Sequence, residues 1–475
     1  MLFNSMEFLL YFIVVTALYF LLPHRVRWFL LLAASCYFYM AFVPVYILIL
    51  GFTIVIDYFA GIFLEEASGK KKRIWLIASL IANIGVLAVF KYYNFLNDNL
   101  SYILHGAGWE NPVPHLSILL PIGLSFHTFQ AMSYTIEVYR GHQRAERHFG
   151  IYALYVMFYP QLVAGPIERP QNLLHQFYEK HDFDYERVLN GLKTMLWGFV
   201  KKLVIADRLA LYVDAVYNNA DQHSGITLII ATVFFAFQIY CDFSGYSDIA
   251  IGAANVMGFK LMRNFNRPYF SSSISEFWSR WHISLSTWFK DYMYISLGGN
   301  RVSIPRWYFN LFIVFLVSGL WHGANWTFII WGALNGIYLV AALVRDRVFN
   351  KLGIATDTGK SGIGKFINIL FTFLLICFSW IFFRAKDLNQ AMLVIRKIFT
   401  FEKGSLFITN PTFTYSLFAI AFLLITESKE EYYKNSLSLI NNKNITVRYI
   451  TCLALVLLIL LIGVFDGSQF IYFQF

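Results

Sequence analysis

Long, continuous apolar runs are the feature of this sequence that most constrains its fold. The first run covers residues 6–22, and the others cover residues 28–50, 51–63, 74–89, 116–138, 151–163, 226–243, 311–321, 326–343, 366–383, 413–426 and 450–464. The strands of membrane barrels alternate apolar and polar residues, so continuous runs predict helices instead. Because a span needs about 20 residues, the runs predict about 9–12 transmembrane helices, with the shorter runs forming re-entrant or buried helices.

The composition supports a membrane protein and excludes a soluble one. Of the 475 residues, 58% are hydrophobic and only 14% are charged. A soluble domain has about 25% charged residues, and a soluble chain this apolar would expose large sticky patches. Disordered chains, collagen and coiled coils need polar or strictly periodic compositions, which this sequence lacks. We therefore expect an all-α polytopic membrane protein, with residues 1–475 forming a single integral-membrane domain.

The basic residues predict the orientation of the chain in the membrane. The formal net charge is +10, and basic residues cluster in short loops such as residues 24–27 and 70–73. Loops of this kind face the cytoplasm. The alternation of basic and uncharged loops places the N-terminus outside, and residues 140–147, 345–365 and 429–448 inside. Since no basic face carries interleaved aromatic residues, the charge does not indicate nucleic-acid binding.

Three segments do not fit simple spans. Residues 188–211 mix lysines and acidic residues with apolar ones, an amphipathic pattern that predicts a helix lying in the membrane interface. Residues 384–403 break the charge alternation and are expected to form a second interfacial helix. Residues 242–248 begin and end with aspartate, which indicates a polar break between two helices.

Several kinds of chemistry leave no signature in this chain. The cysteines at positions 36, 241, 377 and 452 form no CxxC pair, and the spacing of histidines and carboxylates matches no zinc site, so we predict no metal centre. The HExxH, GxSxG, Walker and GxGxxG motifs are also missing. No internal repeat is evident, which argues against an inverted-repeat transporter.

Three of the 11 histidines lie among apolar neighbours, at positions 127, 282 and 322. His322 lies three residues after Gly319. Glycines recur four residues apart at Gly319/Gly323 and Gly332/Gly336, a spacing that lets helices approach closely. A packed core histidine and a functional one both remain open for His322. We favour a functional role, because an ionisable group in a membrane is costly.

His282 lies in a polar and aromatic segment that predicts one helix. Ser273 and Glu276 form a capping box at its start, and Gly298 and Gly299 end it. Helical spacing puts His282 on an aromatic face opposite a polar face. This arrangement suits a helix that lines a cavity, and an interfacial helix with a tryptophan belt remains the alternative.

His127 is better interpreted as a packed polar residue. The other ionisable side chains inside apolar runs are carboxylates: Asp57, Glu137, Glu168, Asp242 and Asp248. A cation path through Asp57, Asp242 and Asp248 is the transporter hypothesis. A buried imidazole, by contrast, is kept neutral by low dielectric and can act as a general base on a hydroxyl. The residues by themselves support acyl transfer or a proton relay, and do not choose between them.

Five segments resemble the membrane-bound O-acyltransferases, and specifically the bacterial branch of alginate and peptidoglycan O-acetyltransferases. They are residues 120–141 (LPIGLSFHTFQAMSYTIEVYRG), 159–170 (YPQLVAGPIERP), 240–250 (YCDFSGYSDIA), 266–299 (including SEFWSRWHISLSTWFKDY) and 319–326 (GLWHGANW). They follow one another in the family's order through the middle of the chain. The RWHISLSTWFKDY and WHGANW motifs carry most of the specificity.

The resemblance implies a bundle of transmembrane, re-entrant and interfacial helices around a central tunnel. His322, in its WHG context, matches the family's catalytic histidine and would act as general base. His282, in its RWH context, matches the second active-site histidine of the branch and would orient the donor or relay a proton. Neighbourhood alone adds four candidate tunnel residues: Arg280, Trp281, Asp291 and Asn325.

The resemblance also implies a reaction and partners. Acetyl-CoA would be the cytoplasmic donor, with no bound cofactor, and the acceptor would be hydroxyls of an extracytoplasmic polysaccharide. A separate SGNH-type partner would complete the transfer at the cell (inner) membrane. The core with the motifs would cover residues 116–343, and C-terminal transmembrane helices would cover residues 366–464. D-alanyl transfer toward teichoic acid from a carrier protein is an alternative. An ion-coupled transporter or a secretion scaffold is the non-enzymatic alternative.

Overall fold

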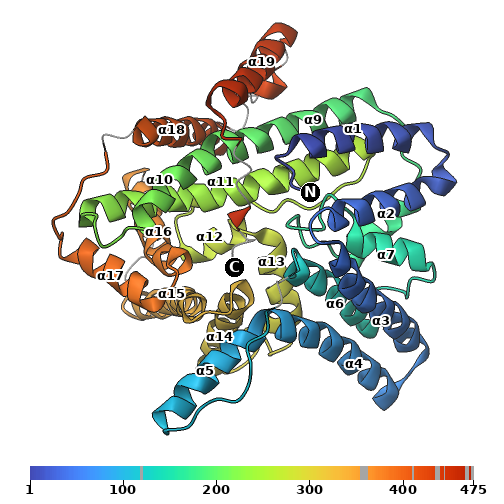
Figure 1. Cartoon of the computed structure of the whole chain (residues 1–475), viewed down its shortest axis with the longest axis horizontal. Helices are drawn as coiled ribbons and strands as arrows, with labels where there is room; N and C mark the ends of the chain where they lie inside the picture. Colours follow the sequence, from blue (N-terminus) through green and yellow to red (C-terminus); the bar gives the residue numbers. More distant parts are fainter. Residues whose placement is uncertain are drawn as a thin grey trace. The chain divides into compact units, whose positions relative to one another are not determined.

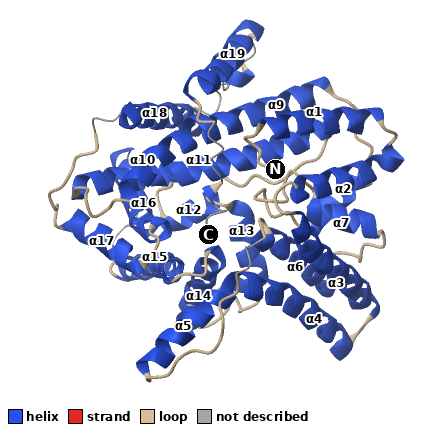
Figure 2. Cartoon of the chain, viewed as in Figure 1, coloured by secondary structure: helices blue, strands red, loops and turns tan. Residues whose placement is uncertain are grey.

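The computed structural model describes residues 1–117, 121–353, 362–408, 411–433, 439–442, 444–465 and 470–471. Over these ranges the chain forms helices and loops and no strand, as Figure 2 shows. The expected all-α membrane class is confirmed. Parts of the predicted segments 116–138, 345–365, 366–464 and 429–448 lie outside the described residues.

The chain divides into two compact units, whose helices carry the labels used in Figure 1. The first unit comprises Met1–Met195 and Ile249–Met262, and the second comprises Leu196–Asp248 and Arg263–Phe475. Helices α9 (Tyr185–Phe199) and α11 (Gly225–Met257) each contribute residues to both units.

The first unit is built from helices that pack around α6. Its elements are α1 Met6–Leu21, α2 His24–Met40, η1 Pro44–Tyr46, α3 Ile47–Glu66, α4 Gly69–Leu87, η2 Ala88–Tyr92, α5 Tyr93–Gly106, α6 Leu124–Arg140, α7 Phe149–Met157, α8 Pro170–Leu173 and η3 Leu174–Phe177. Helix α6 contacts α3, α4 and α7. Between them Asp57 is fully buried, and it accepts hydrogen bonds from Ser79 at 2.6 Å and from Asn83 at 2.8 Å. A buried carboxylate satisfied in this way holds the helices together.

The second unit carries both motif histidines. Its elements are η4 Val200–Ala206, α10 Asp207–Tyr217, η5 Pro268–Phe270, α12 Ile274–Arg280, α13 Ile283–Trp288, η6 Phe289–Tyr294, α14 Ile304–His322, α15 Trp326–Lys351, α16 Gly362–Arg384, α17 Leu388–Phe399, α18 Pro411–Tyr432, η7 Leu439–Asn441 and α19 Ile445–Ile462. The expected helix within residues 384–403 is present as α17.

Among the described residues, eight helices are long and apolar enough to cross a membrane. They are Pro44–Glu66, Gly69–Gly106, Gly225–Met257, Ile304–His322, Trp326–Lys351, Gly362–Arg384, Pro411–Tyr432 and Ile445–Ile462. Other apolar runs form shorter helices: α1 has 16 residues, and the run at residues 151–163 yields only the nine-residue α7. The chain is a multi-pass membrane protein.

The predicted interfacial helix at residues 188–211 differs from expectation. It continues through the π-helical turn η4, which turns its lysines inward. Lys202 is 3% exposed, and its Nζ lies 2.8 Å from Asp207 and 2.6 Å from Asp242. Lys201 pairs with Asp248 at 2.5 Å. These charges are neutralised inside the protein instead of facing an interface, because each ammonium meets a carboxylate within ion-pair distance.

The same ion pairs explain why the polar break expected at residues 242–248 is absent. Helix α11 runs without interruption from Gly225 to Met257. Its two aspartates are paired with lysines, so the helix does not need to open to satisfy them. Gly245 lets α11 approach the segment that contains Gly198 and Lys202. A Cβ on Gly245 would lie 2.8 Å from the Gly198 carbonyl oxygen and 3.1 Å from the Lys202 backbone nitrogen.

The glycine spacing before and after His322 correctly indicates a close helix pair. Helices α14 and α15 pack against each other along their length. A Cβ on Gly319 would collide with the carbonyl oxygen of Phe328 and would lie 3.0 Å from the Cα of Gly332. A Cβ on Gly332 would likewise collide with the Phe315 carbonyl oxygen. Close backbone contact of this kind fixes the end of α14, where His322 stands.

Candidate functional site

His282 lies at a break between two short helices. Helix α12 ends at Arg280, and α13 begins at Ile283. His282 itself has φ 43° and ψ 55°, the left-handed conformation that a non-glycine residue rarely adopts. The single helix expected from Ser273 to Gly298 is therefore wrong. Strained conformations of this kind persist only where the surrounding structure holds them.

Asn264 provides the contacts that hold this break. Its backbone oxygen accepts a hydrogen bond from Ile283 N at 2.8 Å. Its side-chain Oδ1 accepts from Ser284 N at 3.2 Å and from Ser284 Oγ at 2.9 Å. The first amide groups of a helix have no partner within that helix. Asn264 satisfies two of them, those of Ile283 and Ser284, from 19 and 20 residues away, so α13 can begin directly after His282.

The start of α12 follows the predicted capping pattern only in part. Ser273 Oγ accepts from Glu276 N at 3.1 Å, as an N-cap should. The Glu276 carboxylate does not return to Ser273 and instead accepts from both N and Oγ of Ser272, each at 2.8 Å. The predicted helix start is correct, and the reciprocal bond of the capping box is shifted by one residue.

The imidazole of His282 is buried among aromatic rings. The residue is 1% exposed, and its ring centroid lies 4.5 Å from Phe243, 6.2 Å from Phe265 and 6.4 Å from Trp321. Helices α12 and α13 are not among the eight spans. Burial lowers the pKa of His282 to about 3, so the ring is uncharged at neutral pH. An uncharged imidazole can accept a proton.

His322 is the last residue of α14 and is 5% exposed. Its ring is enclosed by three others, with centroid distances of 4.9 Å to Trp321, 5.0 Å to Trp331 and 5.3 Å to Phe383. Trp321 therefore contacts both histidines. The structure brings His282 and His322 into one aromatic cluster, as expected for two groups of a single site.

Tryptophan rings extend this cluster. Trp331 stacks on Trp380 at 5.8 Å, and Trp380 lies 5.1 Å from Trp281. Trp278 contacts Trp331 at 5.7 Å. The chain thus surrounds two imidazoles with aromatic rings, an environment that excludes water.

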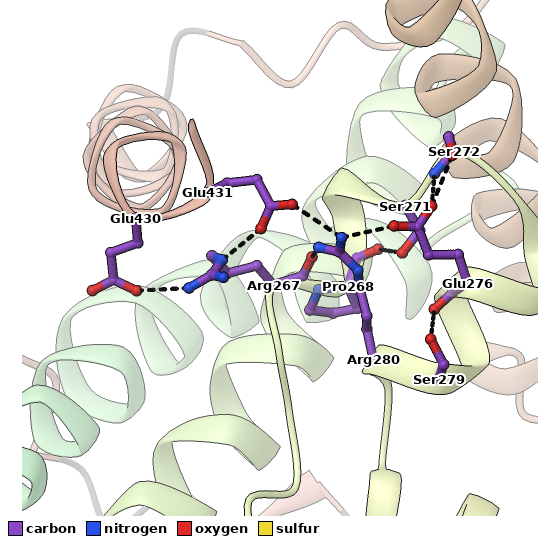
Figure 3. Close-up of polar contacts among 9 residues, drawn as sticks. All are labelled: Arg267, Pro268, Ser271, Ser272, Glu276, Ser279, Arg280, Glu430 and Glu431. Carbon is purple, nitrogen blue, oxygen red and sulfur yellow. Dashed lines mark hydrogen bonds and ion pairs between the residues drawn. The ribbon is translucent and has the colours of Figure 1, made fainter. Parts of the chain in front are cut away.

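Arg280 belongs to an ion-pair cluster. Its Nη2 lies 2.7 Å from Glu276 and 3.0 Å from Glu431 at the end of α18. Glu431 also accepts from Arg267 Nε at 2.8 Å, so it lies between the two guanidinium groups (Figure 3). Glu430 adds a third carboxylate, 3.2 Å from Arg267. Three carboxylates thus surround two guanidinium groups, and Arg280 ties the end of α12 to α18.

The other predicted neighbours have different positions. Trp281 is 1% exposed and is part of the aromatic cluster. Asn325 caps α15 by accepting from Thr327 N at 3.0 Å, and its Nδ2 donates to the Lys386 backbone oxygen at 3.0 Å. Asp291 lies in the π-helical turn η6 and is half-buried. These contacts give Asn325 an evident role in local structure.

The carboxylates of the transporter hypothesis are engaged inside the protein. Asp242 and Asp248 pair with lysines, and Asp57 accepts hydrogen bonds from two neighbours. Within the described ranges, no three or more histidine, cysteine, aspartate or glutamate side chains gather in a group that could hold a metal ion. The arrangement around His282 and His322 thus remains the candidate site.

Sequence reasoning missed Asn264 and Glu431. Asn264 precedes Asn266 and Pro268, residue types that mark a turn, so the sequence indicates a loop there. The pairing of this loop with residues 280–284 has no local signal. The acidic cluster at the end of α18 indicates that cations lie nearby, without identifying Arg267 and Arg280 as those cations.

Comparisons with known proteins give a consistent family. A family model described as the membrane-bound O-acyltransferase family matches residues 115–383. The chain is 41% identical to the probable alginate O-acetylase AlgI of Pseudomonas aeruginosa, over 84% of this chain and 75% of the relative. It is 38% identical to the peptidoglycan O-acetyltransferase of Helicobacter pylori, over 77% of this chain and 72% of the relative. A teichoic acid D-alanyltransferase of Streptococcus thermophilus is 29% identical over 56% of this chain.

Proposed function

Because the chain belongs to the membrane-bound O-acyltransferase family, we propose that it transfers an acetyl group from cytoplasmic acetyl-CoA toward hydroxyls of an extracytoplasmic polysaccharide. As a family member the chain is a multi-pass membrane acyltransferase. The relatives of 41% and 38% identity carry the names of an alginate O-acetylase and a peptidoglycan O-acetyltransferase, which supports acetate as the group moved and a polysaccharide as its destination. The cell (inner) membrane is the compartment where such a donor and such an acceptor meet.

The observation that supports this function most directly is the pair of buried histidines. His282 and His322 come from segments 40 residues apart in sequence, and both contact the ring of Trp321. In the proposal His322 is the general base, and His282 orients the donor or relays the proton. The surrounding rings keep water away, which protects a thioester from hydrolysis.

The proposed step conserves every atom and charge. His322 removes the proton from an acceptor hydroxyl as the hydroxyl oxygen attacks the thioester carbonyl. The new carbon–oxygen bond forms, the carbon–sulfur bond breaks, and the proton passes to the departing thiolate. General-base assistance of this kind contributes about 10²- to 10⁴-fold to a rate. An SGNH-type extracytoplasmic partner then moves the acetyl group from this first acceptor to the polymer, so that the ester to the first acceptor breaks, an ester to a polysaccharide hydroxyl forms, and the hydroxyl proton returns to the first acceptor.

The D-alanyl alternative rests on weaker similarity. The teichoic acid D-alanyltransferase of S. thermophilus is 29% identical and covers 56% of the chain. A D-alanyl group has one more carbon than an acetyl group and carries an amine, so the identity of the transferred group is a direct chemical measurement. A transporter has less support, because Asp242 and Asp248 are neutralised by lysines.

The decisive experiment compares cells that make the wild-type chain with cells that make the His322→Ala variant. Mass spectrometry of the envelope polysaccharides should show acetyl esters in the first and a loss of at least about 100-fold in the second. Equal amounts of both proteins in the membrane fraction confirm that the variant folds. His105→Ala, which replaces an exposed histidine on α5, is the matched control and should retain wild-type acetylation.

Each outcome identifies a different function. If the wild-type cells carry D-alanyl esters and the His322→Ala variant lacks them, the transferred group is D-alanyl and not acetyl. Full acetylation in the His322→Ala variant would contradict the proposal and favour a scaffold. Solute flux in reconstituted vesicles that is lost on Asp242→Asn would favour the transporter.

A further inference from the structure

The side chain of Asn264 is buried against His282. Asn264 is 1% exposed, and its Oδ1 lies 3.1 Å from His282 Nδ1. The same oxygen accepts hydrogen bonds from Ser284 N and Ser284 Oγ. Its Nδ2 donates to Ser247 Oγ on α11 at 3.2 Å, so both ends of the amide are engaged.

These contacts fix which end of the Asn264 amide faces His282. A backbone N–H can only donate a hydrogen bond, and Ser284 N lies 3.2 Å from Oδ1. The atom at that position must therefore be the carbonyl oxygen. A flipped amide would place NH₂ against this donor and would leave the Ser284 N–H without its acceptor.

The orientation of the amide in turn fixes the histidine. A carbonyl oxygen only accepts, so Nδ1 of His282 must carry the proton that it donates to Asn264. In a neutral imidazole only one nitrogen carries a proton, and Nε2 therefore holds the lone pair. Nε2 is the nitrogen that can take a proton from a reacting group.

We propose that Asn264 is a positioning residue that holds His282 in the Nδ1–H tautomer and stabilises the left-handed backbone from which its ring projects. This inference rests on the proposed role of His282 in acyl transfer. Asn264 performs both tasks because one amide contacts the imidazole and the first turn of α13. It acts through His282 and does not itself need to touch the acyl donor.

The test uses purified protein in membrane vesicles, with acetyl-CoA as the donor probe. The acceptor is a soluble form of the polysaccharide or the proposed SGNH-type partner. Asn264→Leu keeps the size of the side chain and removes the acceptor. We expect kcat to fall by about 10- to 100-fold, the range typical of removing an outer hydrogen-bond partner. The KM for acetyl-CoA should change by less than about 3-fold, because binding of the donor is not affected.

Asn264→Asp is the rescue variant. A carboxylate also accepts from Nδ1, so kcat should recover to within about 10-fold of wild type. The carboxylate favours imidazolium, so the acid limb of kcat/KM should move to higher pH by about one unit or more. A purely structural role would also allow the recovery, because a carboxylate still accepts from Ser284 N and Ser284 Oγ, but it would not predict the pH shift.

Two further variants serve as controls. Asn310→Leu replaces an asparagine with 0% exposure in the same unit that bonds to the backbone oxygens of Leu297 and Gly299, and it measures the general cost of losing a buried amide. Ser284→Ala removes one donor to Asn264 Oδ1 and leaves the imidazole contact intact. Both should keep kcat within about 3-fold of wild type, since neither changes the histidine tautomer.

The outcomes separate this inference from the proposed function. If His282→Ala abolishes transfer while Asn264→Leu retains wild-type kcat, Asn264 is not a positioning residue and the proposed function stands. The inference also fails if Asn264→Asp shows the wild-type pH profile, even when Asn264→Leu does not fold. If His282→Ala is itself fully active, the role proposed for His282 fails first.

Discussion

Two buried histidines, His282 in the second unit and His127 in the first, show how differently one residue type can be held. Their exposures are similar, at 1% and 2%. His127 lies inside the regular helix α6, with its backbone N–H bonded to Gly123 O at 3.1 Å. His282 lies where two helices break, in a left-handed conformation supported by Asn264.

The surroundings of the two rings differ as well. His127 makes an edge contact with Tyr39 at 6.3 Å, and among the described residues its Nε2 is buried without a hydrogen-bond partner. His282 has Nδ1 oriented by Asn264 and shares Trp321 with a second histidine. Burial alone therefore does not identify a functional histidine. A strained backbone combined with an oriented ring nitrogen does so more specifically.

The largest expected effect comes from replacing each histidine in turn. His282→Gln should lower acetyl transfer by about 100-fold or more, since in the proposed reaction this imidazole takes part in proton transfer. His127→Gln should leave activity within about 3-fold of wild type, because that residue serves packing. Radiolabelled acetyl transfer by equal amounts of folded protein measures both. Equal losses of activity in the two variants would contradict the difference in role between His282 and His127.

The backbone behind the second histidine should be almost as sensitive. Gly319→Val would place a Cβ against the Phe328 carbonyl oxygen and push α14 away from α15. We expect a loss of activity on the order of 10- to 100-fold, because small displacements of a reacting group are costly. Gly85→Val is the control, since a Cβ there meets nothing within 4 Å. It should remain active, and a comparable loss in both would assign the effect to general instability.

An intermediate effect is expected from the ion pairs that hold α12 beside the break. Glu431→Gln removes the charge that Arg267 and Arg280 share (Figure 3). We expect kcat to fall by about 3- to 10-fold, in keeping with about 1 kcal/mol for each weakened pair. Glu137→Gln in the first unit removes a carboxylate with three polar neighbours at the end of α6, and it should keep wild-type kcat. Steady-state kinetics of both variants would show whether this coupling is specific to His282.

The smallest effect is a pH dependence of stability. Burial lowers the pKa of His282 to about 3 in the folded chain, against about 6.5 when unfolded. Between these values the unfolded chain binds a proton that the folded chain does not. Stability should therefore fall as the pH falls below about 6.5, by up to about 1.4 kcal/mol per pH unit. Between pH 6.5 and 5 the melting temperature of His282→Gln should decrease less than that of wild type. The exposed-site variant His105→Gln should follow wild type.

Much of the site can be predicted from the sequence because its signals are local. The glycines at positions 319 and 332 indicate a close helix pair, and the structure confirms it. Ser273 indicates the start of a helix, which is also correct. The scarcity of charge in apolar runs distinguishes His127, His282 and His322 from the other histidines, and the structure brings the last two against Trp321. Whether they carry the reaction stays a prediction.

Other features could not be predicted because they depend on contacts between distant segments. The capping signals predict one long helix that includes His282. In the structure Asn264 satisfies the first amides of a second helix and so permits the break. Amphipathic periodicity places Lys202 at an interface, whereas Asp242 from α11 makes its burial possible. Local propensity is a weak guide wherever a partner from elsewhere in the chain changes the local balance.

The sequence by itself determined the solvent and the helical class. Apolar runs in a lipid environment must satisfy their own backbone groups, and helices do so within each run. It also selected three histidines, because ionisable groups are rare where lipid is the solvent, and the family motifs reduced these to His282 and His322. Only the tertiary structure decided how one of them is held. The direction of the His282 ring, and which of its nitrogens bears the proton, follow from an asparagine amide that reaches it from another segment of the chain.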